Sequence, residues 1–187
     1  MANLSAKVEA ELEPMEQALR ELPPARGMRK LSVLELAGTA SLLNSFYHGV
    51  ENILKQALLA TGTALPTGAA WHRDLPQTAC AQGIVSPETR DRLAPYLAFR
   101  HFFTHAYGFD LDVEQLQPLV RDVRPVRARF QTEARRFVRA RERKGRPRRS
   151  AGHPHRPGER RAGSRRQASG RAEHGDADGR NEVSRGV

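Results

Sequence analysis

The chain contains a single cysteine, Cys80, and no long run of apolar residues. One cysteine cannot form an internal disulfide, which excludes disulfide-stabilised secreted scaffolds, and it cannot build a cysteine-rich zinc site. No window approaches the roughly 20 consecutive apolar residues that a membrane-spanning helix needs. The segment from Met1 to Pro23 is acidic and lacks the apolar core of a signal peptide. We therefore expect a soluble cytoplasmic protein.

Charge is distributed unevenly along the 187 residues. Residues 1–142 carry 18 basic and 16 acidic side chains, whereas residues 143–187 carry 13 basic and 5 acidic side chains. The second segment also holds eight glycines, three prolines and only two large apolar residues. It cannot bury enough apolar surface to offset its ordering entropy, so we predict a disordered tail. This tail is either a basic arm attracted to RNA, DNA or an acidic partner, or an adventitious extension such as an out-of-frame read-through.

Residues 1–142 show no alternating strand pattern, and their apolar residues recur every three or four positions instead. A basic linker is expected over residues 25–30. Pro76 should limit the short helix that contains it to one or two turns, unless the proline lies in the first turn. The predicted fold class is all-α, an antiparallel bundle of four main helices plus a short helix in one domain. The predicted helices span residues 2–22, 31–60, 72–81, 87–107 and 113 onward.

The predicted helix over residues 31–60 is apolar on more than one face, which is typical of the central helix of a bundle. Ser32 and Glu35 have the spacing of a capping box at its start. Glu51 is an acidic residue on this mostly apolar helix. It could form an ion pair with Arg100 inside the bundle, or it could contact solvent or the N-terminal helix.

The densest polar cluster occurs near the end of the fourth predicted helix, between residues 100 and 107. Arginine offers a permanent charge and a fork that fits phosphate oxygens, and histidine exchanges protons near neutral pH. At 100° per residue, Arg100 and His105 do not converge on one straight helix. They would converge if the last turn unwound or if two chains brought two copies together. The alternative is that these histidines are core or interface residues, which is common in a phenylalanine-rich helix.

Arg100, His105 and Tyr107 form the pattern R-x4-H-x-Y, which resembles the HepT-like ribonuclease toxins of the HEPN superfamily. Two flanking segments strengthen the resemblance. Residues 46–55 look like the family's second helix, with a tyrosine and a glutamate at this spacing. Residues 71–75 resemble the segment that joins the second and third helices. The resemblance covers about residues 2 to 140.

The resemblance implies a HEPN-type fold and a metal-independent endoribonuclease that works as a homodimer without a cofactor. His105 would act as general base or acid, and Arg100 would hold the scissile phosphate. The expected products are a 2′,3′-cyclic phosphate and a 5′-hydroxyl. His101, Thr104 and Glu51 would support the site. A nucleotidyltransferase antitoxin would transfer AMP to Tyr107 and block RNA.

Other interpretations stay open. The chain could be a catalytically idle relative that binds nucleotide or RNA, or assembles with a nucleotidyltransferase. It could also be a helical scaffold whose nucleic-acid affinity comes only from the tail. Trp71, with His72 and Asp74, suggests a nucleotide stack or a metal pair, but a structural anchor is favoured. A basic face could contact RNA, or it could be a solvated surface balanced by Asp122 and Glu133. Its members are Arg121, Arg124, Arg127, Arg129, Arg135, Arg136, Arg139 and Arg141.

Overall fold

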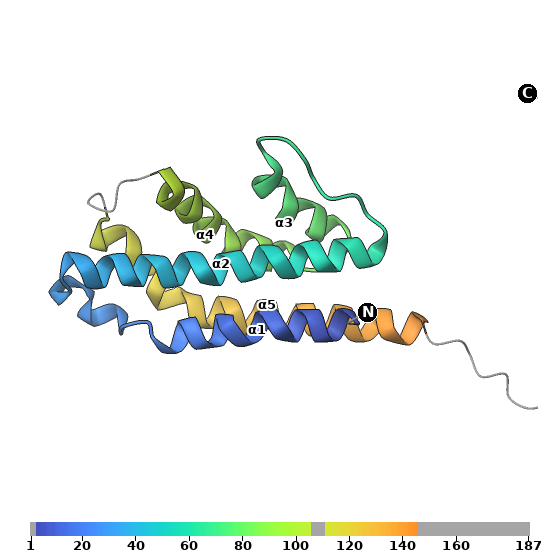
Figure 1. Cartoon of the computed structure of the whole chain (residues 1–187), viewed down its shortest axis with the longest axis horizontal. Helices are drawn as coiled ribbons and strands as arrows, with labels where there is room; N and C mark the ends of the chain where they lie inside the picture. Colours follow the sequence, from blue (N-terminus) through green and yellow to red (C-terminus); the bar gives the residue numbers. More distant parts are fainter. Residues whose placement is uncertain (1–2, 106–110, 146–187) are drawn as a thin grey trace, which may run out of the picture. The chain divides into compact units, whose positions relative to one another are not determined.

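The computed structural model describes residues 3–105 and 111–145, and within these ranges it contains helices and no strands. The predicted all-α bundle, with four main helices and a shorter one, is confirmed (Figure 1). The tail predicted to be disordered lies, apart from its first three residues in the last helix, outside the described residues. The helices are α1 (Leu4–Arg20), the 3₁₀ helix η1 (Ala25–Lys30), α2 (Val33–Thr61), α3 (Trp71–Ala81), α4 (Pro87–His105) and α5 (Val113–Gly145).

Helix α2 lies at the centre of the bundle and contacts each of the other four α-helices (Figure 1). Its apolar residues point in several directions, so neighbours on different sides can bury them. The capping box at its start is present, because Ser32 and Glu35 bond reciprocally. At its end Gly62 takes a left-handed conformation with φ of 78°, which suits glycine. α1 packs with α5, and α3 packs with α4.

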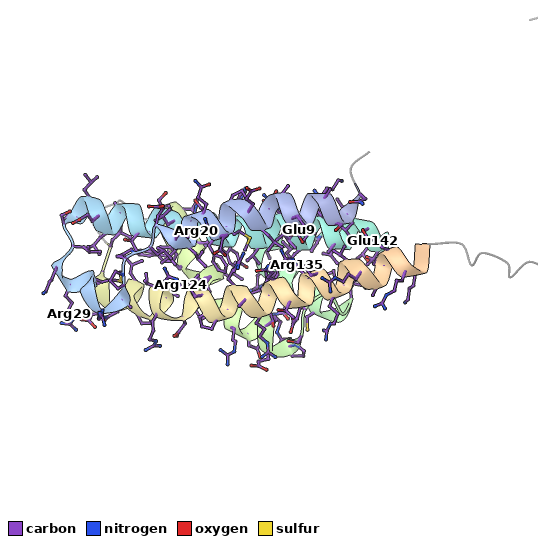
Figure 2. All side chains as sticks on the ribbon, turned by 90° about the horizontal axis from the view of Figure 1, so that it is seen from below. Glu9, Arg20, Arg29, Arg124, Arg135 and Glu142 are labelled. Atoms are coloured by element: carbon purple, nitrogen blue, oxygen red, sulfur yellow. The ribbon has the colours of Figure 1, made fainter. Side chains whose placement is uncertain are left out.

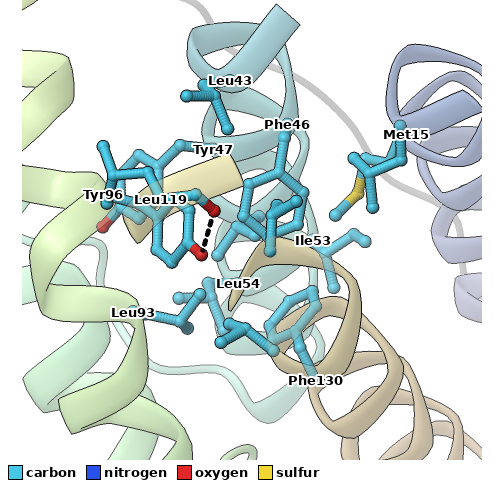
Figure 3. Close-up of a cluster of buried hydrophobic side chains, with 14 of the residues drawn as sticks. Met15, Leu43, Phe46, Tyr47, Ile53, Leu54, Leu93, Tyr96, Leu119 and Phe130 are labelled. Carbon is cyan, nitrogen blue, oxygen red and sulfur yellow. Dashed lines mark hydrogen bonds between the residues drawn. The ribbon is translucent and has the colours of Figure 1, made fainter. Parts of the chain in front are cut away.

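The core is a continuous cluster in which α2 contributes the largest share. Phe46 contacts the ring of Tyr96 edge-to-face at 5.3 Å, and the Tyr96 hydroxyl donates to the carbonyl oxygen of Leu119 at 3.0 Å (Figure 3). That bond satisfies the polar end of a buried side chain and joins α4 to α5. Burial of each such large apolar side chain stabilises the fold by about 1.5–3 kcal/mol.

α1 and α2 approach each other closely at Gly49. A Cβ atom placed on Gly49 would lie 2.5 Å from Cγ and 2.7 Å from Sδ of Met15, a buried residue of α1. A glycine is therefore needed at this crossing, although glycine in a helix interior is intrinsically unfavourable. Figure 3 shows Met15 directed toward the core residues of α2.

Two local predictions were wrong. The expected linker over residues 25–30 is the 3₁₀ helix η1, which buries Met28 completely. The short helix α3 has 11 residues and continues through Pro76. The proline removes one backbone hydrogen bond, but its ring is buried together with Leu75 and Ala79. Packing against the core therefore maintains both elements where local signals indicated interruption.

Candidate functional site

Three helices bring a carboxylate, an imidazole and a guanidinium together. Glu51 comes from the middle of α2, His72 from the first turn of α3, and Arg100 from the last third of α4. The Glu51 Oε1 atom lies 2.7 Å from His72 Nδ1, and the Glu51 Oε2 atom lies 3.2 Å from Arg100 Nε. His72 Nε2 lies 3.2 Å from an Arg100 terminal nitrogen. Each side chain therefore contacts the other two.

The donors and acceptors in this cluster define the tautomer of His72. Arginine has only N–H donors, so His72 Nε2 must accept the bond from Arg100. The other ring nitrogen, Nδ1, then carries the hydrogen and donates it to Glu51. In this arrangement Glu51 receives a hydrogen bond from His72 and an ion pair from Arg100. The imidazole fixes the guanidinium from a second direction.

Burial differs sharply among the three side chains. Glu51 is 0% exposed, whereas the side chains of Arg100 and His72 are 20% and 29% exposed. A carboxylate without water is costly unless it is paired, so removal of Arg100 would leave the buried charge of Glu51 without its counter-charge. The two partners keep one side toward solvent. The cluster thus fixes the Arg100 guanidinium at the surface, while the Glu51 carboxylate that pairs with it stays buried.

Tyr47 lies one helical turn before Glu51 on α2 and is also 0% exposed. Burial raises its pKa well above the usual value, the nearby Glu51 charge raises it further, and Arg100 acts in the opposite direction. Its hydroxyl has no hydrogen-bond partner within residues 3–105 and 111–145. Glu51 Oε2 likewise accepts no aligned hydrogen bond there, and its contact with Arg100 is an ion pair.

A pocket of about 520 Å³ opens beside the cluster. Its lining combines alanines and a leucine with basic and imidazole groups. Such a combination fits a ligand with a flat apolar part and a negative charge. The lining residues are Ala69, Ala70, His72, Arg73, Ala94, Leu97, Ala98, Arg100 and His101.

The predicted site residues differ in whether they contact Arg100, line the pocket or lie outside the described residues. The ion pair between Glu51 and Arg100, one of two alternatives, is present. His101 is exposed and lines the pocket. The hydroxyl of Thr104 donates to the backbone carbonyl of Arg100, so it is bonded to the helix backbone and not to the guanidinium. His105 is the last residue of α4, but its side chain, like the whole of Tyr107, lies outside the described residues.

His72 is the residue that sequence reasoning missed as a partner of Arg100. Its neighbour Trp71 is partly buried against the core, as expected for an anchor. The indole stacks on the His72 ring with 3.4 Å between centroids, and Lys55 Nζ lies 4.1 Å from the indole centroid. The only sequence signal was the position of His72 in the segment of residues 71–75. Its contact with Arg100, 28 residues away, depends on how α3 and α4 pack.

The described part of the chain gives no metal-binding cluster of three or more histidine, cysteine or acidic residues. Cys80 is a free thiol on α3. Among the described helices, none has the length and apolar character required to cross a membrane.

Comparison with known protein families gives a match over much of the chain. A family described as HepT-like protein matches residues 38–141, which is more than half of the chain. This range includes Glu51, His72, Arg100, His105 and Tyr107. No curated protein and no solved structure matches the chain.

Proposed function

Because the chain belongs to the HepT-like family of the HEPN superfamily, we propose that it is a metal-independent endoribonuclease, the toxin of a toxin–antitoxin pair. The observation that carries the proposal is the cluster in which buried Glu51 and His72 hold Arg100 at the edge of a pocket. A cation fixed in this way is suited to bind a phosphate whose charge increases during reaction. We place the protein in the cytoplasm, where RNA is available.

Arg100 binds the scissile phosphate in this proposal. Two of its nitrogens are oriented by Glu51 and His72, and the remaining N–H donors are available to non-bridging phosphate oxygens. Prior fixation removes the need to order a long side chain when substrate binds. Glu51 and His72 are therefore positioning residues, since they act through Arg100. Leu97 and the alanines that line the same pocket offer apolar contacts for a nucleobase next to that phosphate.

His105 performs the proton transfers. It accepts the proton of the ribose 2′-hydroxyl as the 2′-oxygen attacks phosphorus, and the bond from phosphorus to the 5′-oxygen breaks. The leaving 5′-oxygen takes up a proton, either from the same imidazole or from its copy in a second protomer. The products are a 2′,3′-cyclic phosphate and a 5′-hydroxyl end. No metal or cofactor is required for this balance.

The active form is a homodimer whose two R-x4-H-x-Y motifs face one cleft. Arg100 and His105 lie five residues apart, which on a straight helix separates them by about 140°. A second protomer would supply His105 opposite Arg100 and so remove this geometric difficulty. His101 at the pocket edge would donate a hydrogen bond into the same cleft.

Control of the toxin would act on Tyr107. A partner nucleotidyltransferase antitoxin would transfer AMP to its hydroxyl, two residues after His105. The adduct is bulky and anionic, so it would exclude RNA sterically and repel the phosphate from Arg100. A modified sample would accordingly be inactive.

The test is RNA cleavage in EDTA by the wild-type chain and by His105→Ala, after a mass measurement shows that Tyr107 is unmodified. We expect cleavage by the wild type and a loss of about 100-fold or more in the variant. Equal cleavage by both proteins would indicate contamination. No cleavage by an unmodified wild-type dimer across several RNA classes would favour the alternative, an idle relative that binds nucleotide or a nucleotidyltransferase.

A further inference from the structure

The basic face of α5 separates into two groups of arginines. Most of the arginines between residues 121 and 141 form ion pairs or hydrogen bonds. Arg135 makes two bonds to Glu9 of α1, at 2.6 and 2.8 Å (Figure 2), and Arg127 pairs with Glu16 at 2.6 Å. Arg124 donates to a carbonyl oxygen of α1. The remaining engaged arginines are Arg121 with Asp122, Arg129 with Glu88 and Glu133, and Arg141 with the carbonyl oxygen of Ala60.

Three arginines toward the end of α5 are different. Arg136, Arg139 and Arg143 are exposed and make no ion pair or hydrogen bond with any residue in 3–105 or 111–145. They follow one another at spacings of three and four residues, so they share one face of the helix. The helical rise places the first and last about 10 Å apart along the axis. Their charges are therefore concentrated and not neutralised.

The same face is hollowed. The long arginine side chains and the smaller residues between them enclose about 520 Å³. Gln131 and Thr132 add neutral hydrogen-bonding groups to this hollow. Neither of the acids nearby forms an ion pair with the patch: Glu9 is bound to Arg135, although the charge of Arg139 also helps to lower its pKa, and Glu133 accepts bonds from Ser86 at the start of α4. Glu142 is the single exposed acid of α5 in this stretch.

We propose that Arg136, Arg139 and Arg143 form a docking surface for the RNA sugar–phosphate backbone, distinct from the pocket at Arg100. The choice of RNA rests on the proposed function. The surface has no large apolar side chain, whereas protein interfaces gain most of their affinity from buried aromatic or apolar anchors. Unpaired guanidinium groups along a helix match the repeating charge of a nucleic-acid backbone. The two sites share no lining residue, so they are separable by mutation.

The experiment uses the full chain carrying His105→Ala, so that RNA stays intact, and measures binding of a single-stranded RNA oligonucleotide over a range of salt. The patch variant combines Arg136→Gln, Arg139→Gln and Arg143→Gln. Its control combines Arg29→Gln, Arg121→Gln and Arg129→Gln, which removes the same charge from arginines that are already paired and do not line the hollow. Thermal unfolding of both variants shows whether each is folded.

We expect the patch variant to bind RNA at least tenfold more weakly near 0.1 M salt. Its slope of log affinity against log salt should fall by about 2, since each lost phosphate contact contributes about 0.7 for single strands. The control should change this slope by less than the value of one phosphate contact, about 0.7. Equal losses in the two variants, or unchanged RNA affinity in the patch variant, would overturn the proposal; the latter would leave the patch for an acidic protein.

This result is independent of catalysis. Patch-dependent RNA binding by a protein that never cleaves RNA would support the docking surface and refute the proposed activity. RNA cleavage by the wild type, together with RNA binding that does not depend on the patch, would support the proposed activity and refute the docking surface.

Discussion

Two buried carboxylates hold opposite ends of α4. Glu133 of α5 is 7% exposed and accepts bonds of 2.8 Å from both the backbone N–H and the hydroxyl of Ser86, just before the helix begins. Glu51 of α2 is 0% exposed and contacts Arg100 in the last part of the same helix. Both groups are acids in an apolar core. They differ in the surroundings of the residues that bind them.

The partners of Glu133 are bonded around the start of α4. Ser86 and Thr89 are hydrogen-bonded to each other, and Arg129, which pairs with Glu133, also pairs with Glu88. The partners of Glu51 both line an open pocket. Burial tends to raise the pKa of Glu133, but the hydrogen bonds from Ser86 and Thr89 and the charge of Arg129 together outweigh it and hold the pKa below its usual value. A buried, paired acid is therefore not in itself a sign of function. The informative feature is that both partners of Glu51 line a pocket.

The largest expected effect comes from Glu51→Gln, compared with Glu133→Gln. The glutamine keeps the volume of Glu51 but places no negative charge beside Arg100, so the guanidinium loses its orientation. We expect RNA cleavage to fall about 100-fold, the usual consequence of a misplacement near 1 Å. Glu133→Gln should retain activity per folded molecule. If single-turnover cleavage rates fell equally in the two variants, the proposed difference between Glu51 and Glu133 would be wrong.

Glu133→Ala, in contrast to Glu51→Gln, should act on the stability of the protein. It leaves the backbone N–H of Ser86 without its acceptor in a part-buried position, whereas the Ser86 hydroxyl keeps Thr89 Oγ1 as an acceptor. We expect a loss of about 2–3 kcal/mol in the free energy of unfolding. Urea denaturation checks this value. A loss below 0.5 kcal/mol, roughly that of a surface substitution, would show that Glu133 does not hold α4.

Gly49→Ala separates packing from chemistry near Glu51. The added methyl group would collide with Met15, so we expect a loss of about 1–3 kcal/mol in stability, with cleavage per folded molecule retained. Gly38→Ala is the matched control on α2, because nothing lies within 4 Å of the added atom. It should stabilise the protein by up to about 1 kcal/mol, the helix propensity difference. Stabilisation by both substitutions would contradict the close approach of α1 and α2.

His72→Phe tests the residue that sequence reasoning missed. Phenylalanine keeps a ring that can stack on Trp71 but removes both contacts, to Glu51 and to Arg100. We expect cleavage to fall about tenfold, less than for Glu51→Gln, because the ion pair between Glu51 and Arg100 remains. A drop of more than 100-fold would instead suggest that His72 itself exchanges protons with substrate.

The smallest effect concerns pH. The pKa of Glu133 is lowered in the folded protein, so its contribution to stability is complete above the unfolded value near 4.5 and is lost as pH falls through the folded value. The free energy of unfolding of the wild type should decline below about pH 4.5. The decline should be shallower in Glu133→Gln. Parallel curves for the two proteins would mean that Ser86 does not favour the charged form.

The sequence predicted the helices and one contact of the site, and the reasons are physical. Periodicity and caps act locally, so the capping box of Ser32 and Glu35 and the start of α4 after Ser86 could be anticipated. The pair of Glu51 and Arg100 was one of two alternatives because an acid on an apolar helix needs a partner. The contact of His72 with Arg100 depends on helix packing, for which local sequence carries no signal.

The most direct test of the central claim is the identity of the RNA ends that the unmodified wild-type chain produces in EDTA. The proposal that Arg100 and His105 cleave RNA without a metal predicts 2′,3′-cyclic phosphate and 5′-hydroxyl ends, both detectable by mass spectrometry. Cleavage that stops in EDTA, or that leaves 5′-phosphate ends, would contradict it.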